Sequence, residues 1–66
     1  MRPLIEILEN ERTLVHKLES VYRFLLRDDD PEVLGILYVQ KDKIEHQLNE
    51  VRAELKDYIA DLFNQS

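Results

Sequence analysis

Residues 28–32 read Asp-Asp-Asp-Pro-Glu, and this stretch divides the chain into two amphipathic segments. Because proline disfavours α-helical geometry at the residue before it, a helix that enters the stretch must end before Pro31. Proline also suits the first position of a new helix. Asp30, or Asp29 in a capping box with the glutamate that follows the proline, can cap that helix. The stretch therefore predicts a turn at residues 28–30 between two helices.

The segment before the turn, residues 3–27, carries apolar residues at alternating spacings of four and three. This is the heptad pattern of a helix that packs against other helices. The seam so defined consists of Leu4, Leu8, Val15, Leu18, Tyr22 and Leu25. Glu11 is the polar interruption of this seam. A third apolar column is formed by Ile7, Leu14 and Val21. Three columns per heptad predict the wide apolar stripe of a bundle helix.

The segment after the turn, residues 31–64, repeats the pattern over more than four heptads and predicts a second, longer helix. Its seam consists of Leu34, Leu37, Lys41, Ile44, Leu48, Val51, Leu55, Tyr58 and Leu62. A turn this short makes the two helices antiparallel neighbours, in which the numbers of facing residues add up to about 59. The expected fold is all-α: one hairpin domain, residues 1–66, made of helix 3–27, the turn and helix 31–64.

One hairpin cannot cover all the apolar surface that this arrangement creates. At 1.5 Å per residue the first helix is about 37 Å long and the second about 50 Å, so residues beyond about 57 have no helix beside them. That overhang carries Tyr58, Ile59, Leu62 and Phe63, and the residues near the turn are apolar almost all round. We therefore expect the hairpin to dimerise into a four-helix bundle, with a higher oligomer or an obligate hetero-complex as alternatives.

The interface between the two copies is expected mainly on the second helix. The residues assigned to it are Leu34, Leu37, Tyr38, Ile44, Leu48, Val51, Leu55, Tyr58, Ile59, Leu62 and Phe63. Glu11 and Lys41 interrupt the apolar seams and do not face each other within one hairpin. They either pair across the dimer interface, where polar core residues can fix register, or lie at the bundle edge with their aliphatic stems on apolar surface.

Composition excludes several classes of staple and partner. The chain has no cysteine, so disulfides and thiolate metal sites are excluded. A net charge of −5 repels nucleic-acid phosphates and anionic lipid surfaces, so we expect neither nucleic acid nor membrane as a partner. No apolar run approaches the roughly 18 residues of a membrane span, and the N-terminus lacks the pattern of a signal peptide, which together predict a cytoplasmic protein.

No group of residues has the spacing of a catalytic, metal or nucleotide site. The run 28–30 lacks the alternate spacing and the glycine of a calcium loop, so we expect it to cap a helix and interact with water. Asp42, His46 and Glu50 share one helical stripe and could approach a divalent ion. That stripe faces away from the seam and is interpreted as a solvated charged face. We therefore expect neither an enzyme nor a cofactor.

The expected function is that of a small, non-enzymatic, self-associating helical module for protein–protein interaction, with the homodimer as its assembled form and a further protein as its partner. That partner is expected to dock on the end 58–63 or on the apolar cluster near the turn, formed by residues 36–39 and Phe24. The alternative is an acidic regulator that masks a basic surface of a nucleic-acid-binding protein, which the net charge of −5 permits. Charges alternate in sign along both segments, and this favours the first interpretation.

Overall fold

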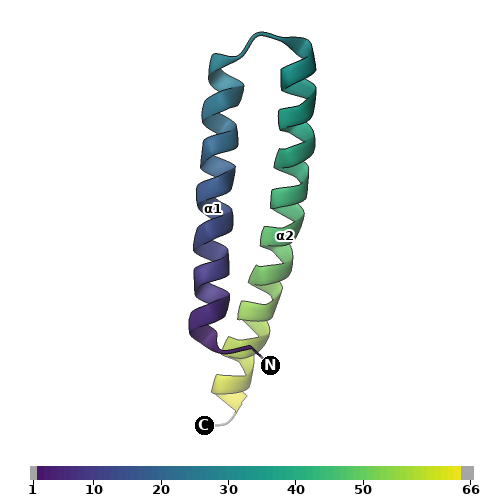
Figure 1. Ribbon diagram of the computed structural model, residues 1–66. Coiled ribbons are helices and arrows are strands. Elements are labelled where there is room, and N and C mark those ends of the chain that lie inside the picture. The colour runs from purple at the N-terminus through teal and green to yellow at the C-terminus, as the bar shows by residue number, and fades with distance from the viewer. Residues whose placement is uncertain (1, 65–66) are drawn as a thin grey trace.

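The computed structural model describes residues 2–64 and forms an antiparallel hairpin of two helices (Figure 1). Helix α1 covers Leu4–Arg27 and helix α2 covers Pro31–Asn64, and the two pack against each other. The prediction of an all-helical hairpin is confirmed. Helix α1 begins one residue later than expected because Pro3 is its N-cap, whose carbonyl accepts backbone N–H groups of the first turn at 3.1 and 3.2 Å.

Asp30 caps α2 in the way that the sequence predicts. Its carboxylate Oδ1 accepts the backbone N–H of Glu32 at 3.0 Å, and its carbonyl accepts the N–H of Leu34 at 2.9 Å. The carboxylate of Asp28 accepts the N–H of Asp30 at 3.3 Å, which ties the turn to the cap. Of the two aspartates that could have capped α2, Asp30 therefore does so, and Asp29 does not accept the capping bond.

The buried core lies in the half of the hairpin that is distant from the turn. Within residues 2–64 the apolar side chains that are almost fully buried are Ile7, Ile44, Leu48 and Val51. Ile7 is the deepest of them, with 1% of its surface exposed. Half-buried side chains extend the contact toward both ends: Leu4, Leu14, Leu18, Val21, Leu25, Leu34, Leu37, Leu55 and Tyr58. The interior of the described hairpin is thus a single apolar layer between two helices.

The rotation of α1 about its own axis differs from the seam that the heptads predict. That seam places Leu8 and Tyr22 against α2, but they are 40% and 42% exposed, whereas Ile7 is buried. Tyr22 supplies the reason, because its hydroxyl donates a hydrogen bond to Glu45 Oε1 at 3.2 Å at the edge of the contact. A tyrosine hydroxyl is costly to bury without a partner, so the column that contains Tyr22 lies at the edge and the wholly apolar column of Ile7 is buried.

The side-chain bonds across the hairpin scatter about the expected pairing. The two residue numbers add up to 56 for Arg2–Glu54, 63 for Glu11–Arg52 and 67 for Tyr22–Glu45, against the expected value of about 59. Side chains of a helix lean toward its N-terminus. In an antiparallel pair the side chains of both helices lean in this way. The ends of two side chains therefore meet when their residue numbers add up to slightly more than the numbers of two residues at the same height in the backbone.

The hairpin is a rod, and its surface is large for its mass. It measures 53 by 15 by 15 Å, and its radius of gyration of 15.5 Å compares with about 11 Å for a compact domain of this length. Its accessible surface of 5362 Å² exceeds that of a compact protein of 7.9 kDa, roughly 4,400 Å², by about 950 Å². Within the described residues, neither helix combines the length and the hydropathy needed to cross a membrane.

Replacing Asp30 with alanine should lower the free energy of unfolding by about 1 kcal/mol, because the N–H of Glu32 loses its acceptor at the start of α2. Chemical denaturation followed by circular dichroism measures the change. Asp29→Ala is the matched control, since Asp29 is exposed in the same turn and should alter stability by less than about 0.5 kcal/mol. Equal losses in the two variants would show that charge, rather than capping, stabilises the turn.

Candidate functional site

Exposed apolar side chains are the most distinctive chemical feature of the rod. Residues 2–64 bury four apolar side chains and expose eleven large ones. The exposed set is Ile5, Leu8, Tyr22, Phe24, Leu26, Ile36, Tyr38, Val39, Ile59, Leu62 and Phe63. Large contiguous apolar patches on a protein surface usually mark a binding site. These side chains can form such a site only where they gather on one side of the rod.

Two cross-helix contacts define one side of the rod, which we call the open flank. Tyr22 donates to Glu45 Oε1 at 3.2 Å, and Arg52 Nε donates to Glu11 Oε2 at 3.3 Å. Residues seven apart share one side of a helix. The open flank therefore carries one column of α1, namely Leu8, Val15 and Tyr22. It also carries one column of α2, namely Tyr38, Glu45, Arg52 and Ile59.

The opposite side of the rod has its own cross-helix contact and is more polar. Arg2 donates to Glu54 through two guanidinium nitrogens, at 2.7 and 3.1 Å. Glu54 lies two residues after Arg52, a rotation of about 200° that carries it to the other side of α2. The column of α2 that contains it is Val33, Gln40, Gln47, Glu54 and Asp61. By its α2 column, the open flank is therefore the less polar of the two sides.

Ionic groups bridge the two helices along the open flank. Glu45 Oε1 accepts a bond from Lys41 Nζ at 3.1 Å in addition to the bond from Tyr22. The hydrogen bond to Glu45 and its negative charge raise the pKa of Lys41 above its ordinary value of 10.5. Glu11 is held by Arg52. Both polar interruptions of the seams, Glu11 and Lys41, therefore have ionic partners within the hairpin.

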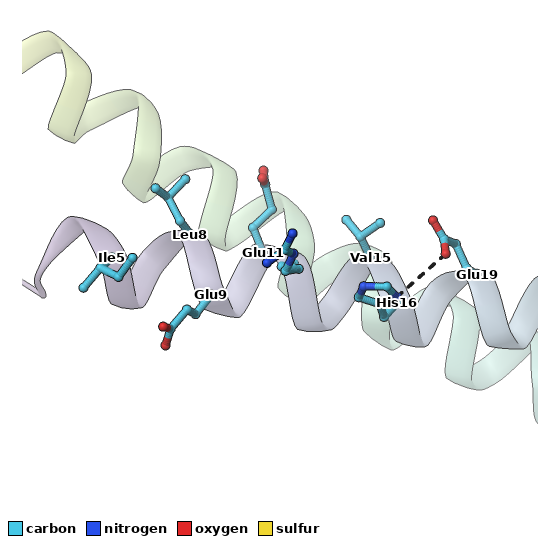
Figure 2. A pocket seen from close by; sticks show the side chains of 8 residues that line it. Ile5, Leu8, Glu9, Glu11, Val15, His16 and Glu19 are labelled. Atoms are coloured by element: carbon cyan, nitrogen blue, oxygen red, sulfur yellow. Dashed lines mark ion pairs between the residues drawn. The ribbon is translucent and has the colours of Figure 1, made fainter.

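A hollow of about 540 Å³ lies on α1 beside the open flank (Figure 2). Its lining includes Ile5, Leu8, Arg12, Val15 and Glu19. Figure 2 shows Leu8, Glu11 and Val15 extending from the same side of α1. Apolar side chains that alternate with charges of both signs are what a helix of another chain presents at a bundle interface. The hollow therefore continues the open flank across the outer surface of α1.

The acidic groups considered as metal sites have other roles in the structure. Within residues 2–64 no three His, Asp or Glu side chains gather closely enough to hold an ion. Asp28 and Asp30 accept backbone N–H groups in the turn. His46 Nε2 and Glu50 Oε1 lie 3.1 Å apart on the exposed surface of α2. The stripe that contains these two residues is a solvated face, as interpreted from the sequence.

The eleven residues predicted for the interface fall into three groups. Buried between the two helices of the hairpin are Ile44, Leu48 and Val51. Half-buried at the same contact are Leu34, Leu37, Leu55 and Tyr58. Exposed are Tyr38, Ile59, Leu62 and Phe63. The first group forms the core of the hairpin, and the exposed group contains both apolar members of the α2 column on the open flank.

Sequence reasoning found Phe24 and Leu26 near the turn but missed the rest of the contribution that α1 makes to the exposed surface. The large exposed apolar residues of this helix are Ile5, Leu8, Tyr22, Phe24 and Leu26. For Leu8 and Tyr22 a signal was present, because the first segment has three apolar columns and theirs is one of them. One neighbouring helix covers about two columns, so a helix with three apolar columns must present one of them elsewhere.

No family model, curated protein or solved structure matches the chain. What the chain does is therefore inferred from its own surface.

The raised pKa of Lys41 can be measured by NMR titration of its side chain. We expect a value above 10.5 in the wild type and a lower one in Glu45→Gln, which removes the negative partner. A lysine whose pKa is raised by folding stabilises the fold below its unfolded pKa, and that contribution is lost as the pH rises through the folded pKa. Stability contributed by this pair should therefore disappear only above about pH 10.5. Identical titrations in the two proteins would contradict the pairing.

Proposed function

We propose that the chain is a non-enzymatic, self-associating helical module, which forms a homodimer of hairpins with a four-helix core and binds another protein. The observation that carries this proposal is the excess of exposed over buried apolar side chains, eleven large ones against four in residues 2–64. A chain of this size buries too little surface to be robust alone and usually needs disulfides, a metal or association. Cysteine is absent, and association supplies the missing burial.

The surface area supports a dimer of ordinary size. The rod exposes about 950 Å² more than a compact protein of its mass. A standard protein–protein interface buries about 800 Å² on each partner. One such interface would therefore bring the exposed surface per chain back to that of a compact protein.

A second apolar surface lies near the turn and faces away from the open flank. Phe24 follows Tyr22 by two residues, and Ile36 precedes Tyr38 by two residues, so each lies about 200° from the open flank. Phe24 is 55% exposed and Ile36 is 64% exposed. We call these two residues the turn-end patch. A dimer formed through the open flank leaves the turn-end patch accessible, and we assign it to the apolar face of a partner helix.

Size-exclusion chromatography with light scattering tests the self-association directly. At micromolar concentration the expected mass is twice the 7.9 kDa of the chain, because the apolar excess drives association. Dilution should shift the protein toward the single-chain mass without loss of material. A folded species of 7.9 kDa at all concentrations would overturn the proposed dimer.

Replacing Phe24 and Ile36 together with glutamine tests the turn-end patch. The dimer mass should stay the same and the stability should change by less than about 1 kcal/mol, because both side chains are mostly exposed. Proteins that the wild type retains in affinity capture from its native cells should no longer be retained. Leu62→Gln, at a 52% exposed residue near the other end of α2, is the matched control and should keep these proteins retained. Equal retention by wild type and double variant would remove the patch from the proposal.

A further inference from the structure

The α2 column on the open flank has a sequence that complements its own reverse. Read from the turn outward it is Tyr38, Glu45, Arg52 and Ile59: apolar, acidic, basic, apolar. Placed antiparallel against the same column of another copy, each apolar residue meets an apolar one and each acid meets a base. Tyr38 and Ile59 are 55% and 43% exposed, so both ends of this column are accessible.

The neighbouring column of α1 has the same property. It consists of Ile5, Arg12, Glu19 and Leu26: apolar, basic, acidic, apolar. The first three of these line the hollow beside the open flank, which places the column on that side of the rod. Reversed, it again matches apolar with apolar and base with acid.

We propose, resting on the dimer proposed above, that the second copy of this chain packs antiparallel on the open flank, with α2 against α2 and α1 against α1. The two-fold axis is perpendicular to the rod. Tyr38 then faces the partner's Ile59, and Glu45 faces the partner's Arg52. All neighbouring helices of the resulting four-helix bundle are antiparallel.

A single two-fold axis relates both helices to their partners only if the centres of the two columns lie at the same height along the rod. The α2 column is centred between residues 48 and 49, and the α1 column between residues 15 and 16. The two centres lie at the same height if an α1 residue and an α2 residue at that height have numbers that add up to 64. The two cross-helix bonds of the open flank, Arg52–Glu11 and Tyr22–Glu45, give 63 and 67, whose mean of 65 exceeds 64 by one residue. The difference of one residue is about 1.5 Å along a helix.

Adjacent columns agree with the same axis. In α2, Asp42 and Lys56 lie symmetrically about Asn49, so each Asp42 faces the partner's Lys56. In α1, Leu8 and Tyr22 lie symmetrically about Val15, so Leu8 faces the partner's Tyr22. The interface therefore contains ionic pairs in the middle of both helices, with Val15 beside those of α1, and apolar contacts at both ends.

The other two-fold arrangement on this flank is disfavoured by charge. An axis parallel to the rod would place α2 of one copy over α1 of the other. By the same register, Glu45 would face the partner's Glu19, and Arg52 would face the partner's Arg12. Like charges in direct opposition suppress an assembly. This arrangement would also bring together two acidic turns, each with the run 28–30.

Charge reversal at Asp42 and Lys56 tests the arrangement, since both side chains are exposed. Asp42→Lys sets lysine against the partner's Lys56, and Lys56→Asp sets aspartate against the partner's Asp42. Each variant alone should have a dimer dissociation constant at least about tenfold higher than the wild type at low salt. Mixed in equal amounts, the two variants should form a heterodimer with nearly wild-type affinity, observed by native mass spectrometry. Lys43→Asp, a matched change on the side of α2 that faces away from the open flank, should associate like the wild type.

The outcomes separate this inference from the dimer on which it rests. If the wild type has the mass of a single chain, both the proposed dimer and its antiparallel arrangement are wrong. If the wild type dimerises but both reversals dimerise equally well and show no preference for each other when mixed, the dimer stands and the antiparallel open-flank arrangement is overturned. Circular dichroism shows whether a single variant has lost helix content. The mixed sample still tests the arrangement, because a heterodimer of the two variants places opposite charges against each other and can be detected by native mass spectrometry.

Discussion

The structure depends on a geometric limit: a helix in contact with one neighbour hides about two of its seven columns of side chains. In α1 the hidden columns are those of Leu4 and Ile7, and the apolar column of Leu8 remains at the edge of the contact. In α2 the buried residues also occupy two columns. The large surface of the rod and the single apolar layer in its described part follow from this limit. A further helix packed on the rod would bury the third column, and this is the role proposed for the second copy.

The limits of the helices could be read from the sequence because they are decided locally. Pro31 excludes helix before it, and Asp30 offers a carboxylate to an N–H two residues later, so a handful of consecutive residues determines where α2 starts. The length of α2 followed in the same way, since apolar residues at regular heptad spacing run from the turn to the end of the helix. These features need no knowledge of what lies across the hairpin.

The rotation of α1 could not be read in this way, because it is decided by contacts across the hairpin. Three apolar columns offer two seams, and in the hairpin Tyr22 bonds to Glu45 across the edge of the contact while the column of Ile7 faces α2. The sequence alone favoured the seam with Leu8, whereas the hairpin buries Ile7. The residues predicted for the dimer interface all lie on α2, so that list leaves out Leu8 and Tyr22, which the predicted seam had placed inside the hairpin.

The ionic groups of the open flank already have partners within the hairpin. A dimer could therefore use these charges for specificity without a large loss of affinity. Glu45 is fixed by Lys41 and Tyr22, and Arg52 is fixed by Glu11, so the side-chain entropy of ordering them is lost on folding rather than on association. Both retain exposed surface, 40% for Glu45 and 55% for Arg52. Partly hydrated charges avoid much of the desolvation cost of a buried ion pair. In the dimer, apolar contacts at the two ends would therefore supply affinity, while preorganised charges between them select the antiparallel orientation.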